Sequence, residues 1–505
     1  MLWTFLSLLA IAVGYYLFKE LTGVYKIYKY KSQGIKRAEY LPMPLMISKM
    51  KKAHKSNDVF AGEKKMMADQ DPNQPFGVKN FGPLCFLSLI SEKAIKDFYA
   101  QEIEATIKKP ISKEVKFLGF LFENRKEVQE KRAIFAKIFH YSNVLNLMPN
   151  MRNVVKQHVS KLRKRVLEEG GQVKIDLKKE FSRALLDDLS ACILLGGTEN
   201  KMVDKFEGMN ITQIIQNIFS LLRKSKRNLV NFLPFVTSLG FNKQLNEVKR
   251  LKQGLIGIIR KQYNKRYNKE ALLEESALDI MIKLNKDSEK RTGKPRFSME
   301  EITSNFELFQ FAASDTSFHL SSTIITYLAL PENQVYQKRV QTEVDSEVDL
   351  ASTLTNEQLN SMKEVDIVFK EAARLANPVA GISRIATKDF KLDGHTVYKG
   401  DIIINILANY EPKHFKDPLK FNPDRFDTKS SSFRTIPRLK QIPFSTGQRG
   451  CLGKHLGEMV VKLIIVELLK EFEVSVEPGY AIKFKQDPLY GVVNPDLIMK
   501  VRTTG

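Results

Sequence analysis

Apolar residues recur every three or four positions along most of this 505-residue chain, the period of amphipathic helices. The strongest signal begins at Ser298-Met-Glu-Glu301, a capping box, and the next proline is Pro331. One helix of about 33 residues is therefore predicted between them. Further helices are predicted at about 123–143, 149–168, 176–194, 208–224, 243–268, 332–346 and 357–376. The polar stretch 47–82 is predicted to be irregular with short helices and strands, and the charged stretch 285–296 is predicted to be an exposed connection.

The pattern changes after Pro378, where β-branched and aromatic residues form short runs separated by turn residues. A tight turn is predicted at Asp393-Gly394. The predicted strands are Ser383–Thr387, Phe390–Leu392, Thr396–Tyr398 and Ile402–Ile404. The expected fold is therefore mainly α-helical with small β-sheets.

The first eighteen residues, Met1–Phe18, carry no charge, which is about the shortest helix that could cross a bilayer. Lysines follow from Lys19 onward, so the positive-inside rule places the rest of the chain in the cytosol. A cleaved signal peptide with Ala10-Ile11-Ala12 as its cleavage site is the alternative. It is disfavoured because the charged leading region is missing and the apolar run continues past the alanines. We interpret residues 1–25 as a membrane anchor and 26–505 as the globular domain.

The formal charge of +23 favours anionic partners such as lipid headgroups, an acidic protein or nucleic acid. Nucleic acid is disfavoured because no recognised binding motif occurs and the lysines are scattered. The three cysteines, Cys85, Cys192 and Cys451, lie far apart, which excludes a disulfide framework or a zinc cluster. Cys85 and Cys192 occur in apolar runs and are predicted to be small core residues.

One stretch combines three glycines with a cysteine, Phe444-Ser-Thr-Gly-Gln-Arg-Gly-Cys451-Leu-Gly453. It precedes an apolar run, Lys454–Phe472, that is predicted to be helical. A sulfur just ahead of a helix N-terminus favours the thiolate, so Cys451 is a candidate metal ligand or nucleophile. A phosphate-binding loop is excluded because Gln448 occupies the position of its first glycine.

Polar residues also interrupt two predicted helices. In the long predicted helix after Ser298, Asp315 and Thr316 have two interpretations. Either their side chains form hydrogen bonds with backbone carbonyls one turn earlier, or they mark a place where the helix is deformed to accommodate a bound group. In the helix at 357–376, Glu371 and Arg374 lie three residues apart, where they can meet on one face. His319 is interpreted as a satisfied interior histidine and His455 as a surface residue.

Together these features resemble the cytochrome P450 family of haem-thiolate monooxygenases, in its eukaryotic, membrane-anchored form. Residues 444–453 match the family signature F-x-x-G-x-R-x-C-x-G at every fixed position. The acid-threonine pair, the E-x-x-R, the F-x-P-x-R-F-like segment Phe421–Phe426 and the N-terminal anchor follow the family order. The resemblance implies the cytochrome P450 fold, preceded by one N-terminal transmembrane helix.

The resemblance also implies haem b as cofactor, with Cys451 as the axial ligand of its iron. Gly447 and Gly453 would let the loop lie close to the porphyrin, and Phe444 would cover the sulfur side. Arg132, Arg384 and Arg449 would pair with the haem propionates. Val128 stands where most relatives carry a tryptophan that donates to a propionate, and Ala313 stands for the glycine before the acid-alcohol pair.

Two further sets of roles come from the resemblance. Glu371, Arg374 and Arg425 would form a buried salt-bridged triad behind the haem loop. Asp315 and Thr316 would relay protons for oxygen activation, with their helix locally opened to hold water. In this family context the relay is preferred to simple back-bonding.

The implied activity inserts one oxygen atom of O2 into an apolar substrate such as a lipid, a sterol or a xenobiotic. Electrons would come from NADPH through a flavoprotein reductase, at the endoplasmic reticulum membrane, with a single-pass anchor and a cytosolic catalytic domain. This acidic partner would be attracted by Arg125, Lys126, Lys131, Arg438 and Lys440, unless these form a merely solvated face. The alternatives are a reductase-independent isomerase or dehydratase of lipid hydroperoxides, and a non-catalytic haem or lipid carrier.

Overall fold

The computed structural model forms two compact units. The first comprises Met1–Lys109, Ile367–Cys451 and Ala481–Val493, and the second comprises Pro110–Asp366, Leu452–Tyr480 and Asn494–Gly505. The described residues are 2–42, 44–45, 48, 71, 73–81, 84–108, 119–123, 125–180, 185, 188–189, 194, 204–227, 243–268, 276–347, 354–408, 410–486, 489–493 and 496–502.

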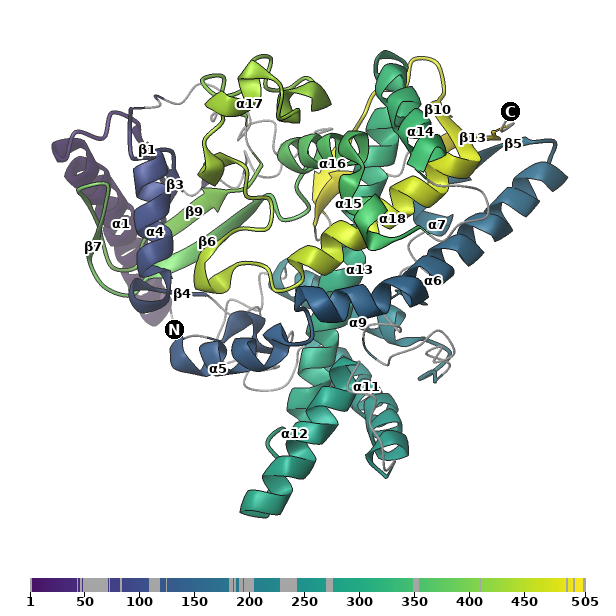
Figure 1. Ribbon diagram of the computed structural model, residues 1–505. Coiled ribbons are helices and arrows are strands. Elements are labelled where there is room, and N and C mark those ends of the chain that lie inside the picture. Colours follow the sequence, from purple (N-terminus) through teal and green to yellow (C-terminus); the bar gives the residue numbers. More distant parts are fainter. Residues whose placement is uncertain are drawn as a thin grey trace. The chain divides into compact units, whose positions relative to one another are not determined.

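The first unit is built on a six-stranded sheet with the strand order β1-β2-β3-β9-β6-β4 (Figure 1). β3 pairs in parallel with β9, and β9 pairs antiparallel with β6. These strands are β1 (Ala38–Leu41), β2 (Phe76–Phe81), β3 (Leu84–Leu89), β4 (Thr106–Ile107), β6 (Gly381–Ala386) and β9 (Ile402–Ile406). Small two-stranded sheets are formed by β7 (Phe390–Leu392) with β8 (His395–Val397), and by β11 (Phe484–Gln486) with β12 (Tyr490–Val492).

The β7–β8 hairpin turns at Asp393 and Gly394, whose φ angles are 48° and 78°. Both are in the left-handed region, as a two-residue hairpin turn of type I′ requires. The predicted turn and the strands that follow Pro378 are confirmed.

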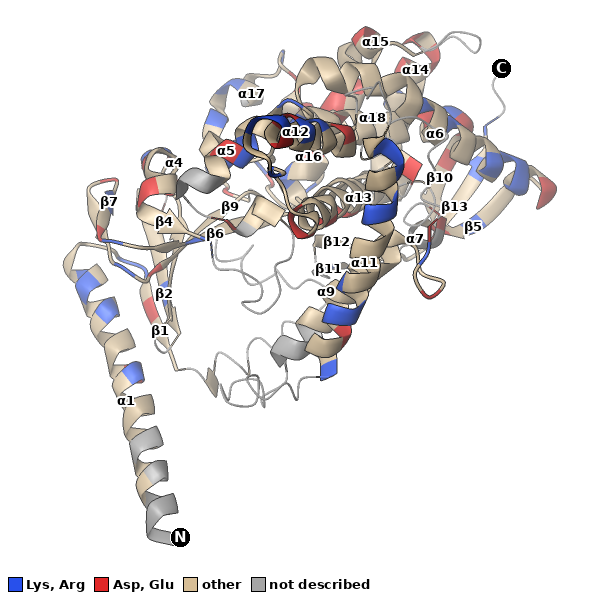
Figure 2. Ribbon diagram, turned by 90° about the horizontal axis from the view of Figure 1, so that it is seen from below, with Lys and Arg blue, Asp and Glu red and all other residues tan. Residues whose placement is uncertain are grey.

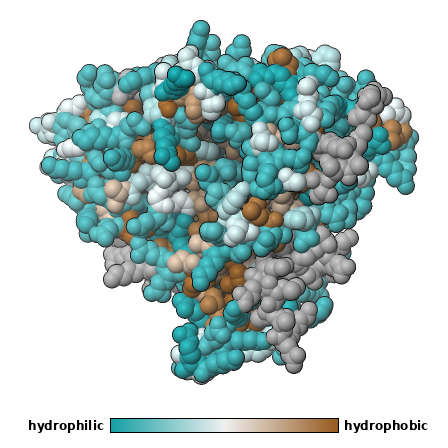
Figure 3. All heavy atoms as spheres, viewed as in Figure 1, coloured by the Kyte–Doolittle hydropathy of each residue, from teal (hydrophilic) through white to brown (hydrophobic). Residues whose placement is uncertain are grey.

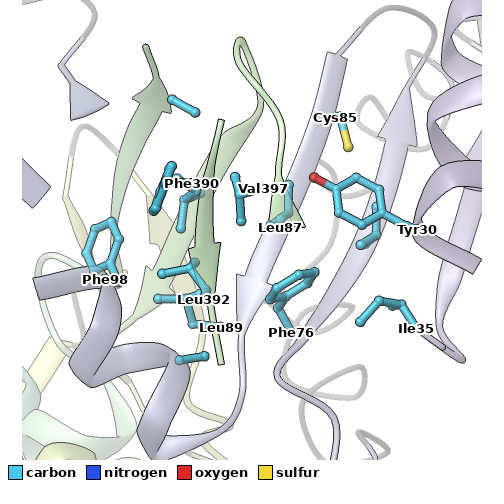
Figure 4. Close-up of a cluster of buried hydrophobic side chains, with 14 of the residues drawn as sticks. Tyr30, Ile35, Phe76, Cys85, Leu87, Leu89, Phe98, Phe390, Leu392 and Val397 are labelled. Carbon is cyan, nitrogen blue, oxygen red and sulfur yellow. The ribbon is translucent and has the colours of Figure 1, made fainter. Parts of the chain in front are cut away.

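Two long helices accompany this sheet, and one side of it forms a hydrophobic core with them (Figure 4). α4 (Glu92–Ala105) contributes Phe98, and α1 (Leu2–Ser32) contributes Ile27 and Tyr30. The shorter elements of the unit are η5 (Pro423–Phe426), α17 (Ser431–Thr435), η6 (Arg438–Lys440) and η7 (Gly447–Arg449).

α1 extends beyond the predicted anchor boundary at residue 25 and ends at Ser32. Among the described residues, no helix combines the length and the apolar character needed to cross a membrane. The side chains of residues 1–6, 8, 9, 11 and 12 lie outside the described part.

The second unit is mainly helical, and its longest helix, α13 (Met299–Ala329), is confirmed as predicted. The Ser298 side chain accepts from the Glu301 N–H, and the Glu301 side chain accepts from the Ser298 N–H, which completes the capping box. The other helices are η1 (Gly119–Phe122), α5 (Arg125–Ala136), α6 (Tyr141–Glu168), α7 (Leu177–Glu180), α9 (Ile211–Arg227), α11 (Lys243–Tyr267), α12 (Ala277–Thr292), η4 (Pro331–Asn333), α14 (Gln334–Glu347), α15 (Asn356–Ser361) and α18 (Lys454–Glu471). A three-stranded sheet has the order β10 (Phe472–Val476), β13 (Asp496–Val501) and β5 (Gln172–Asp176).

Two sequence predictions about helices were wrong. The helix expected at 357–376 is split at Met362 into α15 and α16 (Lys363–Leu375), because the half-buried Glu343 carboxylate accepts hydrogen bonds from the N–H groups of Glu364 and Val365 and so starts a new helix. The stretch 285–296, expected to be a connection, is helical up to Thr292. Its buried Asn285 exchanges two hydrogen bonds with the backbone of Phe297, which holds the end of α12 in place.

The surface is predominantly hydrophilic on the face drawn in Figure 3, with hydrophobic residues scattered among polar ones.

The helices and strands together form the predicted mainly helical fold with small sheets. The unit boundary at residue 366 falls inside α16, so most of this helix belongs to the first unit.

Candidate functional site

The cysteine loop, residues 444–451 of the first unit, closes on itself. The Cys451 N–H donates to the Phe444 carbonyl at 2.9 Å, and the Gly450 N–H donates to the Gly447 carbonyl at 3.1 Å. The Cys451 side chain is exposed at the end of this loop. Backbone bonds thus fix the loop, and they leave the sulfur accessible to a ligand.

The loop lies against Tyr99 of α4. Gly447 has a φ of 72°, a conformation that favours glycine, and a Cβ at this position would make a tight contact of 3.3 Å with Tyr99 Cδ1. The Tyr99 hydroxyl bonds to Ser445 Oγ at 2.9 Å and accepts from Asn405 Nδ2 at 2.8 Å. Burial raises the pKa of Tyr99, so its hydroxyl stays protonated and available for these bonds.

Two further contacts hold the start of the loop. Asn377 Nδ2 donates to the Pro443 carbonyl at 2.8 Å, and the Phe444 ring stacks on Phe369 with centroids 6.3 Å apart. Tyr99 and Asn377 were not found from the sequence, because neither belongs to a motif. The glycine at 447 signals a close neighbour without saying which residue it is.

The structure brings Glu371, Arg374 and Arg425 together in the first unit, where all three are buried. Arg374 Nε and Nη2 donate to the two Glu371 oxygens at 2.7 and 2.9 Å, and Arg425 Nε donates to Oε1 at 3.0 Å. The Asn422 N–H adds a fourth bond to the same carboxylate at 2.8 Å. Both guanidinium groups also lie over the Phe415 ring, 4.8 and 6.0 Å from its centroid.

The three arginines expected at propionates lie in different surroundings. Arg384 of β6 is buried and forms an ion pair with Glu102 of α4, a partner that the sequence did not reveal. Its Nη1 also donates to the Ser383 carbonyl at 2.9 Å. Arg449 is half-buried at the end of η7, and Arg132 is half-buried on α5 of the second unit.

Asp315 and Thr316 are half-buried in the middle of α13 in the second unit. The Thr316 hydroxyl donates to the Ala312 carbonyl at 2.5 Å, the back-bonding that the sequence left open. His319 Nδ1 bonds to the Asp315 carbonyl at 2.7 Å. The expected local opening of this helix is not found, since α13 is unbroken from Met299 to Ala329 and the hydroxyl bond supports its regular turn.

Two of the cations expected to attract an acidic partner are not exposed. Lys440 is buried, where its ammonium bonds to Glu411 at 2.5 Å and to the Ile90 carbonyl at 2.7 Å. Lys131 pairs with Glu123 at 2.8 Å and with Glu301 at 3.3 Å. Neither is the exposed surface cation that was expected, because each is neutralised by carboxylates of its own unit. Arg438 is exposed, whereas the side chains of Arg125 and Lys126 lie outside the described residues.

The remaining chemical residues follow the predictions where they are described. Cys85 is buried in β3, and burial raises its pKa, so it remains a thiol in the core. His455 is exposed. Cys192 lies outside the described residues.

The site was tested for its fit to an iron porphyrin. Among the described residues, no group of three or more histidine, cysteine or acidic side chains could hold a metal ion. A cysteine thiolate is one of the donors that hold haem iron in proteins, and Cys451 could supply it. The exposed Cys451 sulfur fits the group.

The chain is similar to known proteins. The family model described as Cytochrome P450 matches residues 83–502. The chain is 25% identical over 378 residues to "Probable cytochrome P450 4e1" of Drosophila melanogaster, covering 71% of this chain and 67% of that protein. It is 26% identical over 322 residues to "Sterol 14alpha-demethylase" of Mycolicibacterium vanbaalenii, covering 63% of this chain and 67% of that protein.

A third relative and a solved structure complete the comparison. "Cytochrome P450 26B1" of Mus musculus is 28% identical over 351 residues, which are 67% of this chain and 62% of that protein. Across these three relatives the chain spans about two thirds of their length. The solved structure titled "Retinoic acid bound cyanobacterial CYP120A1" superposes with a TM-score of 0.67 at 21% identity, covering 85% of this chain and 92% of that one. This last likeness concerns the fold alone.

Proposed function

Because this chain belongs to the cytochrome P450 family, whose members bind haem b and act as monooxygenases, we propose that it inserts one atom of O2 into an apolar organic substrate. The observation that carries this proposal is the self-closed loop with the exposed Cys451 sulfur at its end. A relative named sterol 14alpha-demethylase supports a substrate of the lipid class. An NADPH-dependent flavoprotein reductase is the proposed electron donor.

In this proposal Cys451 would ligate the haem iron, and Gly447 and Gly453 would let the loop approach the porphyrin. When bound, the haem iron activates dioxygen, and a thiolate ligand increases the electron density on it. The Phe444 ring, fixed by its stacking on Phe369, limits the access of water to the sulfur. Glu371, Arg374 and Arg425 hold the loop's surroundings in place.

Propionate binding is assigned to Arg132, Arg384 and Arg449. Arg384 already contacts Glu102 and the Ser383 carbonyl, but a guanidinium carries five N–H donors and can serve a further acceptor. Glu102 then acts as a positioning residue that orients the Arg384 fork.

Asp315 and Thr316 are assigned to proton delivery. The Thr316 hydroxyl donates a hydrogen bond to the Ala312 carbonyl. The lone pairs of its oxygen can still accept a hydrogen bond from a water molecule. Asp315, which is half-buried on the same turn, can take up a proton from solvent and pass it on.

The class of reaction is tested with purified protein supplied with haem. Reduction and addition of carbon monoxide should give the red-shifted Soret band of a thiolate-ligated haem. Turnover of an apolar substrate should then require NADPH and the reductase. Turnover of a lipid hydroperoxide without either would instead indicate an isomerase or dehydratase, and haem binding without any turnover would indicate a carrier.

Replacing Thr316 with alanine should divert electrons to hydrogen peroxide while haem stays bound. The hydroxyl that holds the proton is lost, so proton delivery fails and coupling of NADPH oxidation to product should fall by about 100-fold, at the lower end of the usual range for general acid–base groups. The measurement compares NADPH consumed, peroxide released and product formed.

Thr326 provides the matched control for that variant. It lies on the same helix and its hydroxyl makes the same bond to the carbonyl one turn earlier, Ser322, at 2.7 Å. Thr326→Ala should therefore keep normal coupling. Equal coupling in the two variants would show that loss of a back-bonded hydroxyl, and not a relay, explains the effect.

A membrane location is also proposed, with the charge-free start of α1 as the anchor and the catalytic residues on the cytosolic side of the endoplasmic reticulum. The support is the sequence of the first eighteen residues and the lysines that follow them. Residues 26–505 form the catalytic part in this proposal.

A further inference from the structure

The second half of α1 is packed into the first unit. Ile27 and Tyr30 are buried, and Figure 4 shows Tyr30 beside Phe76. The Tyr30 ring packs edge-on against the rings of Phe76 and Tyr398, with centroid distances of 5.9 and 5.4 Å. Ile35, just after the helix, is buried in the same core. This part of α1 is therefore a component of the fold.

Asp401, at the start of β9, is the polar centre of this contact and is fully buried. Its carboxylate accepts a hydrogen bond from the Tyr30 hydroxyl at 2.5 Å and forms an ion pair with Lys26. The Tyr398 N–H donates to the same carboxylate at 3.2 Å. Burial and the neighbouring Asp401 charge raise the pKa of Tyr30, so its hydroxyl remains a donor. A buried carboxylate that loses such partners is strongly destabilised, which makes this contact hard to open.

Further bonds extend the contact along the helix. The Thr396 N–H donates to Gln33 Oε1 at 2.6 Å, and Gln33 Nε2 donates to the Thr396 carbonyl at 3.3 Å. The Tyr40 hydroxyl donates to the Glu20 carboxylate. The bonds therefore span residues 20–33, which corresponds to about 20 Å of helix at 1.5 Å per residue.

The opposite face of the same helix segment is exposed and apolar. Leu21, Val24, Tyr25 and Tyr28 are 67, 48, 59 and 68% exposed, and their spacing places them in one stripe. We call these four residues the outer stripe of α1. Lys29 lies at the border of this stripe, 5.3 Å from the Tyr25 ring centroid and 4.4 Å from that of Tyr398. Figure 2 shows lysines along this part of the helix.

The composition of the outer stripe identifies its partner. Tyrosine rings beside lysines are typical of the membrane–water interface, where the ring is buried among headgroups and the ammonium reaches the phosphates. A second copy of this face would bring lysines against lysines, which is unfavourable. The stripe is also continuous with exposed Tyr15, Leu17 and Phe18 toward the proposed anchor.

We propose that Asp401 clamps residues 20–33 of α1 to the sheet, so that the outer stripe contacts the phospholipid headgroup region as a fixed part of the first unit. This inference rests on the proposed membrane location. The clamp makes the connection between the anchor and the catalytic part rigid. It thereby fixes the orientation of the first unit relative to the membrane.

The lipid contact is tested by tryptophan fluorescence, because the chain has one tryptophan, Trp3. The variant carries Trp3→Phe and Tyr28→Trp in the haem-loaded full chain. It is bound to vesicles of phosphatidylcholine and phosphatidylserine, with brominated or plain acyl chains. We expect brominated lipid to remove about half or more of the emission, as for a ring at the interface. The control is Leu419→Trp in a chain that carries Trp3→Phe and keeps Tyr28. Leu419 is an exposed apolar residue of the first unit outside α1, so the emission of a tryptophan at this position should be unaffected by brominated lipid.

The native Trp3 separates failure of this inference from failure of the anchor. If Trp3 is quenched and a tryptophan at position 28 is not, the outer stripe does not contact lipid, whereas the anchor does. Absence of quenching at both positions would overturn both, whatever the haem spectrum shows.

The clamp is tested by amide hydrogen exchange in Asp401→Asn, with Tyr30→Phe and Lys26→Met as milder variants that each remove one partner. Exchange in residues 20–33 should rise about tenfold or more, and β2 and β3 should keep their protection. Unchanged exchange in all three variants would overturn the clamp. Equal loss of protection in β2 and β3 would show that Asp401 supports the whole sheet instead.

Discussion

Replacing Cys451 with serine should abolish the red-shifted Soret band of the reduced, carbon-monoxide-bound protein, together with all reductase-supported turnover. The serine hydroxyl is a far weaker ligand and donor than a thiolate, so the iron loses the electron density that defines this class. The fold should survive, because the Cys451 side chain is exposed and its N–H bond to the Phe444 carbonyl is made by the backbone. Circular dichroism and haem content of the variant check this expectation.

Cys85 gives the control for that experiment. It is a buried thiol in β3, and Cys85→Ala should keep the red-shifted band while lowering the free energy of unfolding by about 1 kcal/mol for the cavity. A red-shifted band in Cys451→Ser would contradict the assignment of the axial ligand. Loss of the band in Cys85→Ala alone would do the same.

The sequence predicts best what depends on neighbouring residues. The capping box at Ser298 and Glu301 and the turn at Asp393-Gly394 are local, since each needs only the backbone within a few positions. The cysteine loop also belongs to this class, because its closure from Phe444 to Cys451 spans one short segment. These elements were found from the residue types alone.

Contacts between distant segments leave no periodic signal, and there the predictions failed or were silent. Lys440 is buried through Glu411 and the Ile90 carbonyl, and Arg384 pairs with Glu102 from another helix. Glu343 ends one predicted helix by capping the next. In each case a side chain meets a group that only the tertiary fold brings near, so neither charge nor pattern identifies the partner.

The triad is an exception, since its E-x-x-R part is local and only Arg425 is distant. The family resemblance supplied Arg425, and the structure places it on the same carboxylate oxygen as the Asn422 N–H. The physical consequence is that one carboxylate, Glu371, serves two buried guanidinium groups. Any change at Glu371 therefore affects more than one partner.

Replacing Glu371 with alanine should lower the free energy of unfolding of the first unit by about 3–5 kcal/mol. Arg374 and Arg425 are only 4 and 5% exposed, so two cations would remain buried without their common counter-charge. Glu371→Gln keeps one acceptor oxygen and should lie between the wild type and alanine. Hydrogen exchange in α16, followed in urea, measures the change within this unit.

Glu247→Ala provides the matched control, because it removes a carboxylate that also meets an arginine, Arg250, at 2.6 Å but on an exposed helix face. Such exposed pairs contribute at most about 1 kcal/mol, so this variant should remain close to the wild type. The rate of haem release to an acceptor protein separates architecture from general stability: it should rise in Glu371→Ala and not in Glu247→Ala. Equal small effects in both variants would mean that the triad is not needed to hold the cysteine loop in its haem-binding form.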